Sequence, residues 1–437
     1  MASNNTRKPR RASGRVSAGA AGNAAGAASG GVGRGSDGAS RAGGDVNEAP
    51  TASRGRYDGW RTLLNPLWCY NGFRVAVVAL TCFGLIMVFS SSAVTSTSSG
   101  QSPFSELLSQ GLYCVVGLVL GVMVMMVPVP LWGMLSWIAM GLAILLQALT
   151  MTPLGYDAGG NVGWISLGPV NMQPAEVMKF AVCVWFPFAL KHFGKKYAVD
   201  GIKAYFVPLL VYGAGLVLVL AGKDLGTAMI IVFIGVTALM LSDFPLKWMG
   251  ACACLMVAVV AVMVISSPNR MRRILATYGD CSAADAQTVC YQSMHARYAI
   301  ASGGLLGVGI GNSREKWNYL PAAHNDFIFA IIGEETGFVG CALVILLFVI
   351  IGWCLIAVAV QTHSRYVSRV LVCVAVWLVG QALVNIGVVV GVFPVLGVPM
   401  PFISSGGSSM VMCLCAAGLV CGLMRAHPQI RSAAQRA

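Results

Sequence analysis

The chain has 437 residues, of which 57% are hydrophobic and only 10% are charged, and its mean hydropathy is +0.74. Soluble domains carry about 25% charged residues, so this composition excludes a soluble globular protein and predicts an integral membrane protein. The formal net charge of +13 does not indicate a nucleic-acid partner. Its basic residues gather in the N-terminal segment, in loops between apolar runs and at the C-terminus, as the positive-inside rule describes.

Residues 1–65 are rich in Gly, Ala, Ser and Arg and contain almost no large apolar side chain. Such a segment cannot bury enough surface to offset the entropy lost on ordering. We therefore predict a disordered basic tail, and we expect it on the cytoplasmic side of the membrane. No apolar stretch follows the early basic residues Arg7 to Arg15, which argues against a signal peptide.

Ten apolar runs follow, and most are long enough for a helix to cross about 30 Å of hydrocarbon. They cover approximately residues 73–91, 107–127, 131–151, 175–193, 205–221, 226–241, 248–265, 326–360, 370–392 and 405–424. The eighth is too long for one perpendicular helix and is expected to begin as a tilted or lipid-shielded segment. Ten spans place both termini on one side, which the charge bias makes the cytoplasm.

The predicted fold is therefore an all-α polytopic membrane protein. We expect one membrane domain over residues 70–425, followed by a short cytoplasmic tail over residues 426–437. The largest extracytoplasmic loop, residues 266–325, lies between helices 7 and 8 and is the longest polar interruption of the apolar sequence. It is the most promising location for chemistry.

The connection before the fourth run contains Trp164 and is rich in Gly and Pro, which fits an irregular or re-entrant segment. Pro174 and Glu176 suit the first turn of the helix that follows. Glu176 and Lys179 are three residues apart and share a helix face. Either they form a structural ion pair, or Lys179 is a cation for a phosphate-bearing ligand. Trp164 is either an interfacial anchor or a platform for a sugar ring.

Asp224 follows Lys223 at a tight turn between the fifth and sixth runs. An Asp at this position can cap the next helix with its carboxylate. The alternative is a direct contact between Asp224 and a ligand.

An arginine cluster follows the seventh run at Arg270, Arg272 and Arg273. Guanidinium groups pair bidentately with phosphate oxygens, so the cluster fits a diphosphate; the alternative is anchoring to lipid headgroups. Asp280 comes seven residues after Arg273, and a carboxylate beside such cations is a candidate general base. Lys316, a further cation of this loop, is a candidate for the same anion.

Cys281 and Cys290 bracket a short excursion that contains Asp285. In an oxidising compartment these two cysteines are expected to form a local disulfide. Most other cysteines lie inside apolar runs, where a thiol behaves as a small hydrophobic group. No Cys/His cluster has the spacing of a zinc site and no Walker A motif occurs, so we predict neither a protein-bound metal nor a nucleotide site.

The eighth run opens with the segment LPAAHNDFIFAIIGEE. Asp326 can cap its helix, and His324 is expected to be a hydrogen-bonding loop residue. Glu334 and Glu335 lie within membrane depth, where carboxylates are costly unless paired. They form either a polar lock between helices or a proton relay. Before the last run, a stretch rich in Pro and Gly carries Ser404 and Ser405, which we expect to be structural polar residues of a re-entrant loop.

Four segments resemble, in this order, the hallmarks of the SEDS family of shape, elongation, division and sporulation proteins: GGNVGWISLGPVNMQPAE, KDLGTAM, KWNYLPAAHNDFIFAIIGEE and PFISSGGSS. The resemblance covers about residues 70 to 425. The segment AHNDFIFAIIGEE is more similar to the actinobacterial type of the division branch than to the elongation branch. The resemblance implies a peptidoglycan glycosyltransferase that polymerises lipid II at the outer face of the cytoplasmic membrane, at the division septum. Implied partners are a class B penicillin-binding transpeptidase (FtsI-like) and other divisome membrane proteins.

In this family an essential Asp follows an arginine pair in the large loop, which points to Asp280 after Arg270 and Arg272. The chain departs from the family after this Asp, because DCSAADAQTVCYQ is longer than the usual segment and lacks its Pro and Gly. Asp285 therefore remains an alternative. Two more departures are Gly163, where the family often has a basic residue, and Lys223, where Pro is common.

The implied mechanism has Asp280 accept the proton of the acceptor sugar 4-hydroxyl, with undecaprenyl diphosphate as the leaving group. Its charge would be balanced by Arg270, Arg272, Lys179 and Lys316. No cofactor is required, although a divalent cation (Mg²⁺ or Mn²⁺) on the diphosphate is compatible with the sequence. The alternatives are an elongation polymerase, a lipid II flippase or transporter, and a non-catalytic division scaffold.

Overall fold

The computed structural model describes residues 59–157, 162–168, 170–265, 267–279, 290–317 and 319–434. The chain divides into two units, Met1–Thr51 and Ala52–Ala437, and every described residue belongs to the second. The predicted tail lies outside the described residues up to position 58.

Within these ranges, nine helices are long and apolar enough to cross a membrane. A tenth, α7 (Leu225–Met240), is apolar but has only 16 residues, or about 24 Å at 1.5 Å per residue. The other spans are α1 (Pro66–Ser98), α2 (Ser105–Met126), α3 (Trp132–Leu149, preceded by η3, Val129–Leu131), α4 (Pro174–Gly194), α6 (Phe206–Ala221), α8 (Leu246–Ile265), α11 (Ile328–Gln361), the α12–α13 span and α14 (Gly407–Met424). They coincide with the ten predicted runs, which confirms the all-α polytopic fold.

Three consecutive elements form the ninth span. α12 (Arg365–Ala375) continues through a π-helical turn, η6 (Val376–Gly380), into α13 (Gln381–Val389). Such π turns often occur at functional sites because they redirect side chains. Trp377 lies in this turn and Gln381 directly follows it, and both are completely buried.

The long helix α11 is broken at Gly337, whose φ of 67° and ψ of −164° lie outside the helical region. A side chain at this position would overlap the backbone of Gly307, so only glycine fits. Residues 328–335, before the break, are all buried inside the protein. The eighth run, which was predicted to be too long for one perpendicular helix, thus forms two helical segments. The first segment is buried in the protein and therefore shielded from lipid.

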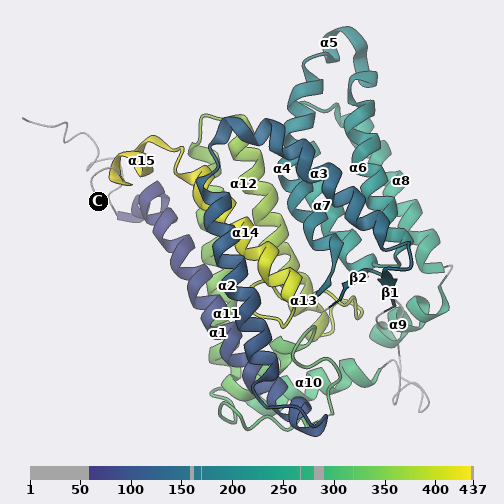
Figure 1. The fold of residues 1–437 in the computed structure, drawn as a ribbon, viewed down its shortest axis with the longest axis vertical. Coiled ribbons are helices and arrows are strands. Elements are labelled where there is room, and N and C mark those ends of the chain that lie inside the picture. Colours follow the sequence, from purple (N-terminus) through teal and green to yellow (C-terminus); the bar gives the residue numbers. More distant parts are fainter. Residues whose placement is uncertain are drawn as a thin grey trace, which may run out of the picture. The chain divides into compact units, whose positions relative to one another are not determined.

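α2 and α14 pack closely along their length (Figure 1). Glycines allow this approach, because a Cβ at Gly418 would overlap the carbonyl oxygen of Gly121. Small residues serve the same purpose at other helix interfaces in membranes. α8 is the opposite case, since none of its residues is buried.

The connection between α3 and α4 contains a small antiparallel sheet of β1 (Gly155–Tyr156), β2 (Trp164–Leu167) and β3 (Val170–Met172). Tyr156 pairs with Trp164, and Ile165 pairs with Met172. The prediction of an irregular or re-entrant segment was wrong here. Of the residues that suggested it, Gly168 directly follows β2 and has a φ of 76°.

The large loop also contains two helices that the sequence analysis did not predict, α9 (Pro268–Tyr278) and α10 (Tyr291–Gly303). The successive spans run in alternating directions, so the bundle has two distinct ends (Figure 1). We call the end with the sheet, α9 and α10 the cavity end. The end with η2 (Gly59–Leu64), α5 (Tyr197–Asp200), η4 (Gly201–Tyr205) and α15 (Pro428–Ala434) is the terminal end.

Candidate active site

The connections at the cavity end enclose a cavity of about 850 Å³. Its wall combines segments that are far apart in the chain: the α6–α7 turn, α9, the residues before α11, and the α13–α14 connection. The volume is within the range of small-molecule sites. Charged side chains from three of these segments line it, namely Lys223, Asp224, Arg270, Arg273 and Asp326.

Asp224 is 3% exposed and uses both carboxylate oxygens within the protein. Oδ1 accepts a hydrogen bond from Thr227 N at 3.0 Å, which is the helix cap expected at the start of α7. Oδ2 accepts from Gln173 Nε2 at 2.9 Å. The carboxylate is therefore fixed at the cavity wall.

Asp326 lines the same cavity just before α11 begins. Burial, and secondarily the nearby Asp224 carboxylate, raise the pKa of Asp326 to about 6, while Arg273 opposes the shift. No side-chain cap links Asp326 to α11, whose N-cap residue is Phe327. Among the described residues no group of three or more His, Cys, Asp or Glu side chains could hold a metal ion.

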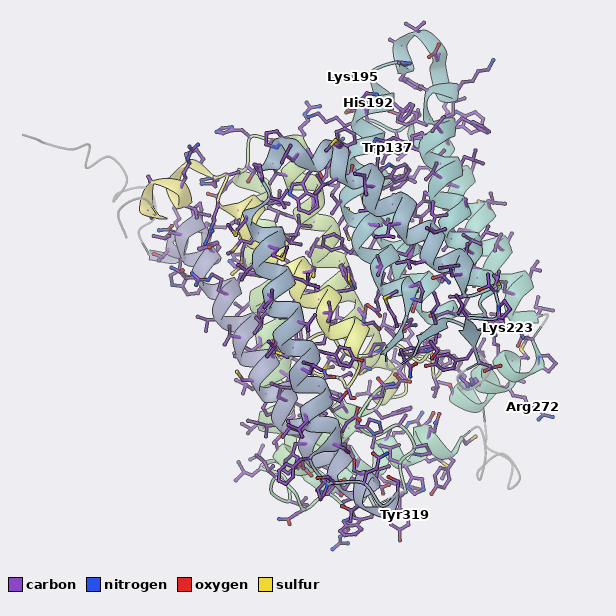
Figure 2. All side chains as sticks on the ribbon, in the orientation of Figure 1. Trp137, His192, Lys195, Lys223, Arg272 and Tyr319 are labelled. Carbon is purple, nitrogen blue, oxygen red and sulfur yellow. The ribbon has the colours of Figure 1, made fainter. Side chains whose placement is uncertain are left out.

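Arg270 and Arg273 lie one turn apart on α9 and both reach the cavity wall. Arg270 donates to the carbonyl oxygens of Lys223 (2.9 Å) and Met263 (3.2 Å), and Arg273 donates to that of Val395 (3.4 Å). Each guanidinium has five N–H donors, so both keep donors beyond these backbone bonds. Arg272 is exposed and is not part of the cavity wall (Figure 2).

Lys223, at the α6–α7 turn, has a φ of 65°, which is unusual for a residue with a side chain. Its carbonyl oxygen is the acceptor for Arg270. The strained turn thus holds one of the two cavity arginines in place.

The predicted catalytic residues Asp280 and Asp285, and Cys281, lie outside the described residues. The flanking helices are described, and both contribute to the cavity: α9 through Arg270 and Arg273, α10 through Gln292. Cys290 forms a disulfide bond, and its predicted partner is Cys281.

Glu176 and Lys179 form a buried ion pair of 2.8 Å in the first turns of α4, with exposures of 0% and 1%. Lys179 Nζ also donates to Gln381 Oε1 at 2.7 Å and lies 5.5 Å from the centre of the Trp377 ring. Neither residue of the ion pair lines the cavity. The structure therefore supports the ion-pair alternative, and a diphosphate contact of Lys179 stays a prediction.

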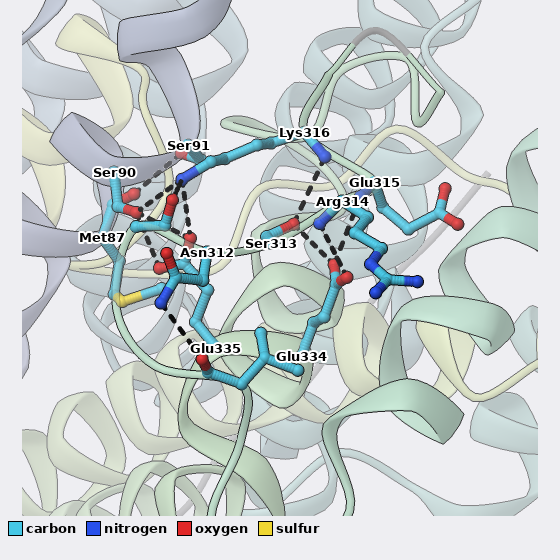
Figure 3. Close-up of polar contacts among 12 residues, drawn as sticks. Met87, Ser90, Ser91, Asn312, Ser313, Arg314, Glu315, Lys316, Glu334 and Glu335 are labelled. Atoms are coloured by element: carbon cyan, nitrogen blue, oxygen red, sulfur yellow. Dashed lines mark hydrogen bonds and ion pairs between the residues drawn. The ribbon is translucent and has the colours of Figure 1, made fainter.

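Lys316 belongs to a second buried ion pair, with Glu335 at 3.0 Å (Figure 3). Its Nζ also donates to Gly311 O at 2.6 Å, and Ser90 on α1 donates to Glu335 Oε2 at 2.6 Å. The pair thus joins α1, the loop after α10 and α11. Lys316 does not line the cavity, so its proposed contact with a diphosphate also stays a prediction.

Glu334 binds the same loop from the neighbouring position of α11 (Figure 3). It accepts hydrogen bonds from Ser313 Oγ (2.5 Å) and from the backbone N–H of Arg314 (2.8 Å). Together Glu334 and Glu335 form a polar lock, as the first of the two sequence alternatives describes. We name Ser90, Ser313, Lys316, Glu334 and Glu335 the loop lock.

The break at Gly337 extends this attachment to the backbone. Glu334 O and Glu335 O accept from the N–H groups of Val308 and Gly309, at 3.0 Å each. In return, Phe338 N and Val339 N donate to the carbonyls of Gly304 and Leu305. Backbone groups left without a helical partner by the break are therefore satisfied by the loop.

His324, Ser404 and Ser405 join two cavity-wall segments. Ser405 N donates to His324 O at 2.9 Å, and Ser404 Oγ donates to Asn325 O at 2.7 Å. Ser405 Oγ also donates to Glu106 at the start of α2, at 2.5 Å. Burial lowers the pKa of His324, and Glu106 opposes this shift.

Trp164 on β2 is partly buried and lines the cavity, with its ring 6.4 Å from that of Tyr156. Gln173 also belongs to the wall but was not among the predicted site residues, and Arg273 was predicted in the arginine cluster but the diphosphate was assigned to Arg270 and Arg272. The signal for Arg273 was available, because residues 270 and 273 share a helix face while 272 does not. Gln173 had no comparable signal in the sequence.

The comparisons with known proteins agree with this arrangement. Residues 72–429 match the family model FTSW_RODA_SPOVE, described as cell cycle protein. A relative from Mycobacterium tuberculosis, named probable peptidoglycan glycosyltransferase FtsW, is 31% identical over 88% of this chain and 72% of its own length. The FtsW of Taylorella equigenitalis is 35% identical over 77% of this chain and 93% of its own. The stage V sporulation protein E of Bacillus subtilis is 32% identical over 80% and 95%.

Solved structures show the same fold. A chain from a peptidoglycan synthase complex that coordinates polymerization and crosslinking aligns with a TM-score of 0.66 and 25% identity, covering 82% of this chain and 98% of that one. RodA of Thermus thermophilus, a rod shape determining protein, aligns with a TM-score of 0.60 over 83% of this chain and 97% of its own, at 24% identity. The chain is thus a multi-pass membrane protein that belongs to the FtsW/RodA/SpoVE family of cell cycle proteins, the SEDS family that its motifs resemble.

Proposed function

We propose that this protein is a peptidoglycan glycosyltransferase that polymerises lipid II during cell division. The observation that carries the proposal is the cavity in which Arg270 and Arg273 of α9 face a fixed carboxylate wall, directly before the segment with Asp280. The names of the FtsW relatives support the same activity. They also favour a septal role over elongation, which would be the task of a RodA-type polymerase.

In the proposed reaction, the Asp280 carboxylate accepts the proton of the 4-hydroxyl of the acceptor sugar. The hydroxyl oxygen attacks the anomeric carbon of the growing strand, and the bond from this carbon to the diphosphate breaks. Undecaprenyl diphosphate leaves with the bonding electron pair. A positioned base contributes about 10²–10⁴-fold to such a step, and cations placed at the departing charge contribute further stabilisation.

We assign the diphosphate to Arg270 and Arg273, because both reach the cavity and neither forms an ion pair within the described part of the chain. Lys179 and Lys316 are less suitable, since each is already paired with a buried glutamate. A divalent cation carried by the diphosphate itself is compatible with this assignment, with Asp224 and Asp326 as the nearest described carboxylates of the wall.

The transporter alternative depends on Glu334 and Glu335 as a proton relay. Glu335 accepts a short hydrogen bond from Ser90, and Glu334 accepts bonds from Ser313 and from the backbone N–H of Arg314. Because moving a proton through this pair would break these bonds, the contacts favour a structural role, and we retain the polymerase.

The proposal includes a class B penicillin-binding transpeptidase as partner, supported by the alignment with a chain of a peptidoglycan synthase complex. It also places both termini in the cytoplasm and the cavity end outside. Two fusion proteins with a reporter that is active only in the cytoplasm test this orientation. One carries the reporter after Ala437, and the other carries it between α2 and α3. Activity at both positions is expected, because α15 and the α2–α3 connection both belong to the terminal end.

The central experiment is strand polymerisation from purified lipid II, with the partner transpeptidase present and its catalytic serine blocked. We expect Asp280→Ala to abolish long strands and Asp285→Ala to retain them, with unchanged folding and partner binding in both. Long strands from Asp280→Ala would refute the base assignment. If Asp285→Ala alone makes no long strands, the role of general base moves to Asp285. If the wild type makes no polymer, the polymerase proposal is refuted.

A further inference from the structure

A second cavity lies at the terminal end of the bundle and shares no residue with the candidate active site. It has a volume of about 740 Å³ and lies between η2, the last turns of α11 and the start of α15. Figure 1 shows α15 and the start of α1 at the opposite end from α9 and α10. We call it the terminal groove; its wall includes Arg61, Leu64, Trp353, Val360, His363 and His427.

Two hydrogen bonds fix the walls of the groove relative to each other. Trp353 Nε1 on α11 donates to Leu63 O at 2.8 Å, and Gln361 Nε2 donates to Leu64 O at 2.7 Å. These bonds tie the turn η2 to α11, so two walls of the groove have a fixed separation. The groove is therefore a built feature of the fold.

One wall of the groove is apolar and open to the surroundings of the bundle. The exposed fractions are 79% for Val360, 48% for Trp353, 42% for Ile356 and 40% for Leu64. Because these residues lie on or next to helices long enough to cross a membrane, we infer that acyl chains can reach their exposed surface. A ligand on this wall must offer hydrocarbon.

The other end of the groove is polar and carries the permanent positive charge of Arg61. Arg61, His363 and His427 line it, and within the described part of the chain no ion pair links any of them to a carboxylate. The ion-paired carboxylate at the terminal end, Asp243, instead approaches Arg365 and Arg369. His427 Nδ1 is buried without a hydrogen-bond partner among the described residues. A ligand here must bring negative charge and hydrogen-bond acceptors.

We propose that the terminal groove binds one anionic glycerophospholipid, with its phosphate between Arg61, His363 and His427 and an acyl chain along Trp353, Ile356 and Val360. Charge complementarity favours a lipid over the chain's own N-terminal segment. Residues 1–58 contain nine basic and four acidic residues and few large apolar side chains, so they would bring positive charge to a cationic site and no hydrocarbon.

Burial lowers the pKa of His427, and the neighbouring His363 lowers it further. A bound phosphate would offset this effect and favour the protonated form of His427. The lipid headgroup and the histidine pair are therefore complementary.

The test is native mass spectrometry of the full-length protein with phosphatidylglycerol or phosphatidylcholine as the added lipid. We expect one phosphatidylglycerol to be retained in preference to phosphatidylcholine. Arg61→Gln should weaken phosphatidylglycerol binding about fivefold, the usual effect of one basic residue on an anionic lipid surface. The matched control is Arg365→Gln, which removes the same charge from an exposed position at the same end and should leave binding unchanged.

A second variant tests the apolar wall independently of charge. Val360→Trp fills the groove from a 79% exposed position, so it should abolish retention of the lipid without changing the unfolding temperature. Equal losses in Arg61→Gln and Arg365→Gln, or equal retention of the two lipids, would overturn the proposal. It would also fail if a full-length variant with Gln at the nine basic positions of residues 1–58 bound phosphatidylglycerol more tightly, because the N-terminal segment would then be the occupant.

Discussion

Two lysines and two arginines place positive charge near the cavity end of the bundle, but in opposite electrostatic surroundings. Lys179 and Lys316 are 1% and 5% exposed, and each is neutralised by a buried glutamate. Arg270 and Arg273 donate to backbone carbonyls, and among the described residues neither forms an ion pair, although Asp224 and Asp326 line the same cavity. The difference separates cations that stabilise the fold from cations that can balance the charge of a ligand.

The largest effect is expected from breaking a lysine–glutamate pair. Glu335→Gln keeps the shape of the side chain but leaves Lys316 buried without a counter-charge, which typically costs about 3–5 kcal/mol. Denaturant unfolding in detergent measures the loss. The double variant Lys316→Met/Glu335→Gln should recover most of the stability, and wild-type stability of Glu335→Gln alone would contradict the structural role of the pair.

The next effect concerns the carboxylate that faces the arginines. The pKa of Asp326, raised to about 6 in the folded protein, exceeds the value of about 3.9 in an unfolded chain. Burial therefore disfavours the ionised form, and the folded state loses stability as the pH rises from about 4 through 6. Asp326→Asn should be more stable than the wild type by about 2–3 kcal/mol at pH 8.

This advantage of Asp326→Asn should disappear near pH 4, where the wild-type side chain is also neutral. Unfolding curves at pH 4, 6 and 8 measure the difference. A difference that does not change with pH would show that the substitution acts through packing and not through charge.

Removing an arginine from the cavity should affect catalysis and leave folding intact. We expect Arg270→Gln or Arg273→Gln to lower the polymerisation rate about 10–100-fold, the usual size of a lost charge-assisted hydrogen bond. Arg272→Gln is the matched control on the same helix and should stay within about twofold of the wild type. Similar losses in all three variants would mean that net loop charge, and not the cavity geometry, determines the rate.

The smallest effect is expected at the helix cap. Asp224→Ala removes the bond to Thr227 N and should destabilise the protein by about 1 kcal/mol, while Asp224→Asn should retain most of the cap. Thermal unfolding of the two variants gives the comparison. If Asp224→Asn loses polymerisation although its stability is normal, the carboxylate charge has a role in the cavity in addition to capping.

The positions of the membrane spans could be predicted from the sequence because each span appears as an apolar run of matching length. The cavity wall was partly predictable, since loops rich in Gly, Pro and charge mark Asp224, Arg270 and Asp326. The partners of Lys179 and Lys316 could not be predicted, because Gln381 and Ser90 come from other spans and only the packed bundle brings them near. The sheet around Trp164 could not be predicted for a different reason, because its strands are too short to show a periodic pattern.

The exchange of backbone hydrogen bonds at Gly337 has a consequence for how this region tolerates change. Backbone groups of residues 304–309 pair with the groups of α11 that have no helical partner at the break. The length of this connection is therefore fixed by the pairing. One additional residue there would shift every N–H out of register with its carbonyl and would also displace Lys316 from Glu335. Tags and inserted domains therefore belong in other connections, and natural variation in the length of this one should be rare.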